Sequence, residues 1–220
     1  LYGDGKDDLG NRWFIGEPIG VIYDYDMIGI WQEDEIAAGK HKDWDPTAEA
    51  GDVKLVDRNG DKKIDADDKY VKGQTTPKWI GGLTNTFTYK NFTLSVFIQT
   101  VQGLMKTNSL IGAAADEVGR RNFTTEISYW TPENKSNEWR SLSKTSNRHG
   151  YGFAQDASFT RVKDITLSYT FTPEMMKKVG LGGLTVYASG RNLFTFTDWV
   201  GWDPEARNHG RGSGSWADNY

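Results

Sequence analysis

The feature that most constrains this chain is an alternation of apolar and polar residues over two neighbouring segments, 79–89 and 92–101. One side of these segments carries Trp79, Leu83, Phe87 and Tyr89, followed by Phe92, Leu94, Val96 and Ile98. The other side carries Thr84, Thr86 and Thr88, followed by Thr93, Ser95 and Gln99. Because successive side chains of a strand point to opposite faces, both segments are predicted strands. Lys90 and Asn91 would form the hairpin turn, in which Asn tolerates the positive φ that such turns need.

Two later segments continue the pattern and predict an all-β protein with antiparallel strands. Residues 158–171 alternate, with Ile165, Leu167, Tyr169 and Phe171 opposite Thr166, Ser168 and Thr170. A turn through 173–183 leads to a final strand that starts at Leu184. Near the beginning, residues 15–31 predict an irregular, glycine-rich strand. The remaining stretches are predicted loops, namely 32–78, 102–157 (with room for a short helix in 110–129) and 197–220.

The alternation fits two architectures, a soluble β-sandwich and the wall of a transmembrane β-barrel. The polar faces of a sandwich meet water and should be rich in Lys and Glu, but here they hold mostly Thr, Ser, Gln and Asn. Such residues suit the hydrated lumen of a barrel. The apolar faces end near the turns in the aromatic residues Tyr89, Phe92, Tyr169 and Phe171, as in an interfacial girdle. The strand pattern alone leaves both architectures open.

The positions of the long loops add a consistency check in favour of the barrel. If 90–91 and 172–183 are short periplasmic turns, the three long stretches 32–78, 102–157 and 197–220 all fall on the opposite, extracellular side. Outer-membrane barrels have this asymmetry of short periplasmic turns and long outward loops. The sequence has no Met at its first position, Leu1, and no signal peptide follows. We therefore expect a chain that is incomplete at its ends.

Composition and motifs argue against several classes of function. The formal net charge is −4 and no run of Lys or Arg occurs, so we expect no nucleic-acid binding. The absence of cysteine excludes a disulfide framework and thiolate metal sites. His41, His149 and His209 are isolated in the sequence, and no HExxH, GxSxG, GxGxxG or P-loop motif occurs. We therefore expect that the chain has no enzymatic activity.

The sharpest chemical signal is the acidic segment DRNGDKKIDADD at 57–68. The positions that ligate calcium in a twelve-residue loop hold Asp57, Asn59, Asp61, Lys63 (through its carbonyl), Asp65 and Asp68. Two residues depart from the pattern, since Lys62 replaces the usual Gly and Asp68 replaces the bidentate Glu. We expect a calcium ion that rigidifies a surface loop within 51–69, and the alternative is a solvated acidic turn.

Several blocks of the chain resemble the SusC/RagA family of TonB-linked outer-membrane transporters. The earlier blocks are GEPIGVIYDYDMIGIWQ at 16–32, GDVKLVDRNGDKKIDADDK at 51–69 and TPKWIGGLTNTFTYKNFTLSVFIQ at 76–99. The later blocks are YWTPENKSNEW at 129–139, SFTRVKDITLSYTF at 158–171 and LTVYASGRNLFTFTDWVGWDPEA at 184–206. Their occurrence in the family's order makes residues 1–220 resemble the C-terminal part of such a β-barrel.

The resemblance implies a plugged barrel of about 22 strands in the lipid of the bacterial outer membrane. It also implies import of oligosaccharides or peptides, together with a SusD-like surface lipoprotein and with TonB, which would act through an N-terminal part absent from this sequence. In the last outward loop, Trp199, Trp202 and Trp216 could stack on a sugar, contact the lipoprotein or pack internally. The alternative function is a soluble, calcium-stabilised, carbohydrate-binding β-domain.

Overall fold

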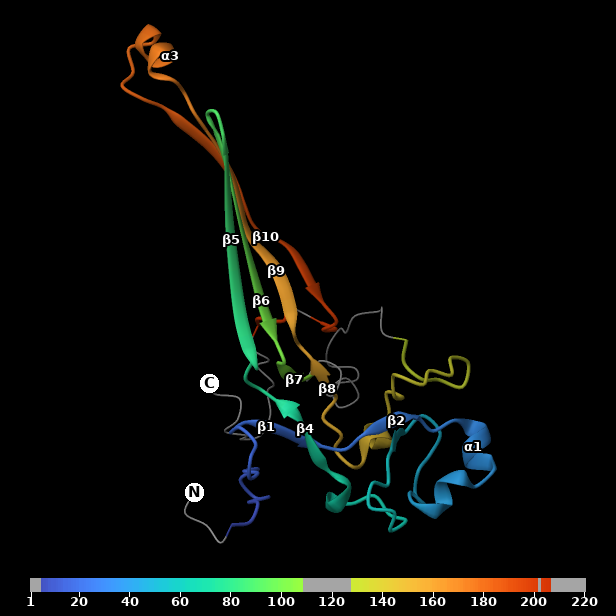
Figure 1. Cartoon of the computed structure of the whole chain (residues 1–220). Helices are drawn as coiled ribbons and strands as arrows, with labels where there is room; N and C mark the ends of the chain where they lie inside the picture. The colour runs from blue at the N-terminus through green and yellow to red at the C-terminus, as the bar shows by residue number, and fades with distance from the viewer. Residues whose placement is uncertain (1–4, 109–127, 202, 207–220) are drawn as a thin grey trace. The chain divides into compact units, whose positions relative to one another are not determined.

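The computed structural model describes residues 5–108, 128–201 and 203–206. Residues 1–75, 106–155 and 206–220 form one compact unit, and residues 76–105 and 156–205 form a second one. We call the first the loop unit and the second the sheet unit. Most regular structure in the described residues is β, as predicted (Figure 1). No helix in this described part has both the length and the apolar character needed to cross a bilayer.

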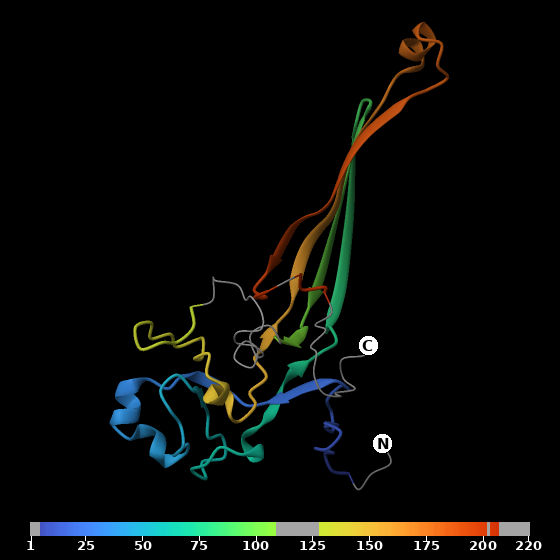
Figure 2. The same cartoon turned by 180° about the vertical axis from the view of Figure 1, so that it is seen from behind.

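The sheet unit contains four long antiparallel strands. These are β5 (Trp79–Tyr89), β6 (Phe92–Gln102), β9 (Phe159–Thr170) and β10 (Thr185–Thr197), in the order β10-β9-β6-β5. The two views in Figures 1 and 2 show them side by side along their length. Register shifts occur between Phe97 and Ile98 in β6 and between Arg191 and Phe194 in β10. The predicted strands 79–89, 92–101 and 158–171 and the strand from Leu184 are therefore confirmed.

The hairpin between β5 and β6 is confirmed, but its backbone strain lies on a different residue from the predicted one. Lys90, and not Asn91, has the positive φ, at 52°. Asn91 instead uses its amide, donating from Nδ2 to the Thr170 carbonyl at 2.5 Å. The hairpin is thereby tied to the end of β9.

The turn between β9 and β10 contains a short helix, α3 (Pro173–Lys178), which the sequence interpretation missed. Thr172 caps it, accepting a hydrogen bond from the Met175 amide, and Pro173 occupies the first turn, where its missing N–H costs nothing. Met176 is buried at 5% exposure and anchors the helix. The signal was available in the Thr172-Pro173 pair.

The secondary structure predicted for residues 15–31 and for residues 32–78 was wrong. Residues 15–31 form two short strands, β1 (Val21–Asp24) and β2 (Met27–Ile30), instead of one. At the end of β1, the Asp24 carboxylate accepts hydrogen bonds from the amides of Tyr25 and Gly152, both at 2.8 Å. Residues 32–78 are not simply loop; they contain α1 (Glu33–Ala37), η1 (Lys40–Asp43), β3 (Val53–Leu55), η2 (Ala66–Asp68) and β4 (Tyr70–Gln74).

Antiparallel pairing and a small apolar core hold the loop unit together. Strand β1 pairs with β4, and β2 pairs with β3. The core cluster is formed by Tyr25, Ile30, Val53, Leu55, Ile64, Trp130, Tyr151 and Phe153. Residues 102–157, predicted as a loop with room for a short helix, also contain β7 (Met105–Thr107), η3 (Lys144–Asn147) and β8 (Ala154–Asp156), with β7 paired to β8, so that prediction was incomplete. The short helix expected within 110–129 falls almost entirely outside the described residues.

Candidate functional site

One face of the four-stranded sheet is apolar and open. The register places Leu83 opposite Ile98, and it aligns Leu94 of β6 with Leu167 of β9. Phe87 is 62% exposed and Val186 is 55% exposed. Large contiguous apolar patches are rare on the water-exposed surface of soluble monomers, so this face is suited to lipid or to another apolar surface.

Aromatic residues border this apolar face at both ends. Tyr89, Phe92 and Tyr169 form one row across β5, β6 and β9 at the turn end, and the rings of Phe92 and Tyr169 are 4.7 Å apart. At the other end of the sheet, Trp79 and Phe196 are exposed. Strands β5 and β6 have 11 residues each, which is enough for a tilted strand to cross a hydrocarbon core, for which about 9–11 are needed. These dimensions and girdles match a membrane-spanning wall.

The opposite face is polar and holds the segment that follows β10. Arg161 of β9 is 3% exposed and donates to Thr195 Oγ1 at 2.8 Å and to Asp203 Oδ1 at 2.6 Å. Glu205 contacts the same guanidinium and also accepts from Lys163 Nζ at 2.6 Å. We call these four charged residues, Arg161, Lys163, Asp203 and Glu205, the arginine clasp. The arginine holds the pKa of the Asp203 carboxyl below its usual value.

Trp199 is buried beside the clasp, at 9% exposure, in a cluster with Val101, Leu104, Ala157 and Phe159. The sequence left stacking on a sugar, contact with the lipoprotein and internal packing open for Trp199, and in the structure this side chain packs internally. Trp202 and Trp216 lie outside the described residues, and their contact with a ligand stays a prediction. The clasp and Trp199 together hold Trp199, Asp203 and Glu205 against the polar face.

In the loop unit, residues 57–68 adopt a compact turn in which the carboxylates are held by backbone amides. Asp57 accepts from the amides of Gly60 at 2.7 Å and Lys62 at 2.9 Å. Asp68 is 1% exposed and accepts from the amides of Arg58 at 2.7 Å and Asp65 at 2.9 Å. Asn59 Oδ1 likewise accepts from the Asp61 amide at 2.9 Å.

The donor chemistry of this turn suits calcium, although the side chains do not converge on one point. Lys62, at the place usually held by Gly, has a φ of 67°, and the apolar anchor Ile64 is buried. The Lys63 ammonium lies between Asp61 Oδ2 at 3.2 Å and Asp65 Oδ2 at 3.0 Å. These carboxylates raise the pKa of Lys63, and the Asp67 amide and Lys63 lower the pKa of Asp65. Within the described residues, no group of three or more His, Asp or Glu side chains is placed to hold a metal ion.

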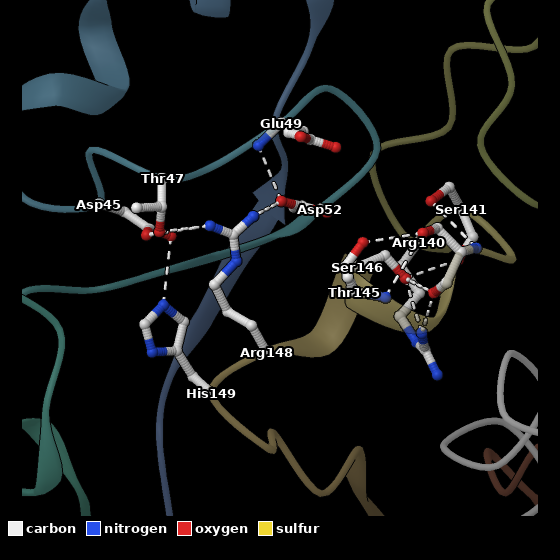
Figure 3. A network of polar contacts seen from close by, with 11 residues as sticks. Asp45, Thr47, Glu49, Asp52, Arg140, Ser141, Thr145, Ser146, Arg148 and His149 are labelled. Atoms are coloured by element: carbon white, nitrogen blue, oxygen red, sulfur yellow. Dashed lines mark hydrogen bonds and ion pairs between the residues drawn. The ribbon is translucent and has the colours of Figure 1, made fainter.

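A buried charge network joins two distant segments of the loop unit (Figure 3). Arg148 contacts Asp52, donates to Thr47 Oγ1 at 2.5 Å and lies 3.9 Å from Asp45. His149 Nε2 lies 3.3 Å from Asp45 Oδ2. Burial raises the pKa of the Asp52 carboxyl, an effect that the Glu49 amide and Arg148 oppose. The network ties residues 45–52 to the segment after η3.

Comparison with known proteins identifies the family. No protein-family model matches the chain. It is 32% identical over 226 residues to TonB-dependent receptor P26 of Formosa agariphila, covering 100% of this chain and 22% of that receptor. It is 28% identical over 174 residues to TonB-dependent receptor SusC of Bacteroides thetaiotaomicron, covering 70% of this chain and 15% of SusC. Its fold matches a chain of the RagAB peptide transporter with a TM-score of 0.61 and 24% identity, over 87% of this chain and 21% of that one.

The chain belongs to the SusC/RagA-like TonB-dependent receptors. It spans about a fifth of the length of the relatives it matches, at 19% and 22% for two receptors of Formosa agariphila. Receptors of this family are outer-membrane proteins, so the predicted localisation is confirmed. The sheet of the sheet unit is a part of the receptor's β-barrel wall. Its apolar face has the character of the lipid-facing side of such a wall.

Two charged groups of this SusC/RagA-like segment were missed by sequence analysis, namely the arginine clasp and the network around Arg148. In the clasp, Arg161 and Asp203 are 42 residues apart in sequence. In the network, Arg148 and Asp52 are 96 residues apart. Neither pairing has a local spacing signal in the sequence.

Proposed function

We propose that this chain is part of an outer-membrane transporter that imports oligosaccharides or peptides, driven through TonB. The observation that carries the proposal is the two-sided sheet. One face is apolar and bordered by aromatic rows, and the other is polar and holds an ordered segment through Arg161. Such a sheet separates lipid from a hydrated interior, which a transporter needs and a water-soluble binding domain does not.

Three further parts of the proposal come from the named relatives. One solved structure that shares the fold is titled a peptide importer, and the curated relatives are named as TonB-dependent receptors. We infer that TonB supplies the energy and that a SusD-like lipoprotein cooperates at the extracellular side. The relatives are receptors and importers, which supports a role in uptake without catalysis.

The uptake proposal can be tested in cells that lack the receptor carrying this chain. These cells, and cells complemented with the full-length receptor, would be given fluorescent oligosaccharides and peptides too large for porins. We expect uptake of one class to require the receptor and to stop when TonB is deleted. Equal uptake with and without the receptor would contradict the proposal. So would recovery of the receptor in the aqueous fraction without detergent, which would favour the soluble binding domain.

We also propose that residues 57–68 bind calcium and so stiffen this surface loop. The support is the oxygen donors at alternate positions, the positive φ of Lys62 and the buried anchor Ile64. The ligands would be the carboxylates and amide oxygen of Asp57, Asn59, Asp61, Asp65 and Asp68, with the Lys63 carbonyl. For the ion to bind, the Lys63 ammonium would have to leave the space between Asp61 and Asp65.

A further inference from the structure

The end of the sheet that carries the short turns has an unusual surface, built by the β5–β6 hairpin and α3. The Thr170 amide donates to the Asn91 carbonyl at 2.9 Å, so β9 ends beside the hairpin. Figure 1 shows α3 beyond the ends of β9 and β10, on the same side as that hairpin. This surface lies just past the aromatic row of Tyr89, Phe92 and Tyr169. We call it the turn-end surface.

The turn-end surface is positively charged. Lys90 in the hairpin and Lys177 and Lys178 in α3 are all exposed. None of the three makes an ion pair within the described residues, whereas Lys54, Lys72 and Lys163 all do so. The Lys90 ammonium lies 5.4 Å from the centre of the Tyr89 ring, at the edge of the aromatic row. Glu174 is the acidic residue of α3, so this helix carries two positive charges against one negative charge.

Apolar side chains are exposed beside these lysines. Met175 is 44% exposed, Val179 is 64% exposed and Leu181 is 50% exposed. Their exposure is not a sign of a loose turn, because Met176 is buried and Thr172 caps the helix. A fixed helical turn with apolar side chains and adjacent lysines is the pattern of a segment that lies in the interface of a bilayer.

A shallow hollow of about 450 Å³ adjoins the turn-end surface. It lies where the chain leaves β9 and returns to β10, and it is lined by Thr170, Phe171, Pro173, Gly182, Gly183, Leu184 and Thr185. Its lining combines an aromatic ring with hydroxyl groups and glycine backbone. Such a lining can contact both an acyl chain and the polar glycerol region of a lipid.

We propose that the turn-end surface binds the anionic headgroups of phospholipids in the periplasmic leaflet. The surface continues the lipid-facing side of the sheet, and its lysines complement phosphate charge. Short turns mark the periplasmic end of an outer-membrane barrel, which places this surface at the phospholipid leaflet. The apolar residues would lie among the upper acyl chains, and Lys177 and Lys178 would extend to the phosphates. This role is independent of what the receptor transports.

The test is native mass spectrometry of the full-length receptor carrying this chain, purified in detergent and titrated with phosphatidylglycerol or phosphatidylcholine. The variant Lys177→Gln/Lys178→Gln removes the charges, and Lys177→Arg/Lys178→Arg keeps them. The matched control, Lys40→Gln/Lys42→Gln, removes two exposed lysines from η1 in the loop unit. Inorganic phosphate at the lipid concentration serves as the competitor that tells a headgroup site from a free-anion site.

We expect tighter binding of phosphatidylglycerol than of phosphatidylcholine, weakened about fivefold for each lysine removed. The arginine variant and the η1 control should bind like the wild type, and inorganic phosphate should not displace the lipid. Equal binding of the two lipids would overturn the proposal, as would unchanged binding in the double glutamine variant. Displacement by phosphate would overturn it in favour of a simple anion site. Because only lipid binding is measured, these outcomes do not depend on transport.

Discussion

The guanidinium of Arg161 in β9 donates from Nη2 to Oδ1 of Asp203 at 2.6 Å and joins the first residues of β9 to the segment beyond β10. Arg161 is nearly fully buried, so its charge depends on Asp203 and Glu205 for compensation. The contact therefore holds Asp203 and Glu205 against the polar face of the sheet.

Replacing Arg161 by Ala should release residues 199–205. The Asp203 side chain is 51% exposed, so its carboxylate meets water when Arg161 is lost, and the loss is that of charge-assisted hydrogen bonds, about 1.5–3 kcal/mol. We therefore expect hydrogen exchange of the Trp199 and Glu205 amides to accelerate at least about 10-fold. Arg191→Ala is the control, because Arg191 is exposed and lies 3.8 Å from Asp164. An exposed pair of this kind contributes at most about 1 kcal/mol. Equal exchange in the two variants would contradict the clasp.

The clasp should also weaken in acid. Asp203 has a folded pKa below its ordinary value of 3.8, mainly because Arg161 donates to it. A lowered carboxyl pKa gives stability that is fully present above the unfolded pKa and is lost as the pH falls through the folded pKa. We therefore expect pepsin to cut the 199–205 segment faster as the pH drops below 3.8, after correction for the enzyme's own pH profile. The variant Asp203→Asn should remove most of this dependence.

The strands could be predicted from sequence because side-chain alternation is a local property with a period of two. Val96 and Ser95 illustrate this, since their faces follow directly from their positions. The clasp and the Arg148 network could not be predicted in this way, because each joins charged residues far apart in the chain. A charged residue in a polar loop gives no sign of its partner. The acidic loop lies between these cases. The spacing of its oxygen donors is local, but the position of the Lys63 ammonium between Asp61 and Asp65 depends on how the loop folds.

The assignment of faces predicts that two adjacent substitutions differ in how strongly they destabilise the receptor. Val96 lies on the lipid-facing side near the middle of β6, and Ser95 lies on the polar side. Val96→Arg should destabilise the receptor by about 2–4 kcal/mol, the cost of a cation at the midplane. Ser95→Arg should cost less than about 1 kcal/mol. Urea titration of the receptor refolded into phospholipid vesicles would measure both, and a larger loss for Ser95→Arg would reverse the assignment.

Alanine substitutions at two glycines of the loop unit should distinguish the cost of backbone strain from the cost of a steric clash. Gly51 and Gly60 both have positive φ, at 90° and 76°. A Cβ on Gly51 would lie 2.5 Å from Trp130 Cε3, whereas nothing lies within 4 Å of one on Gly60. Gly60→Ala should therefore cost only the backbone strain, about 1–2 kcal/mol, and Gly51→Ala about 1–3 kcal/mol more. Hydrogen exchange at the Ser141 amide, which donates to the Gly51 carbonyl at 2.9 Å, reports the second effect.

Calcium binding at 57–68 should be governed by competition with Lys63. Its ammonium lies between Asp61 and Asp65, which raise its pKa and keep it charged at neutral pH. Because the ion and the ammonium need the same oxygens, Lys63→Ala should raise the calcium affinity of the full-length receptor in isothermal titration. Lys62→Ala is the matched control, since Lys62 makes no ion pair in the described part of the chain. Asp57→Ala and Asp61→Ala should abolish binding, and unchanged binding in both would show that any calcium site lies elsewhere.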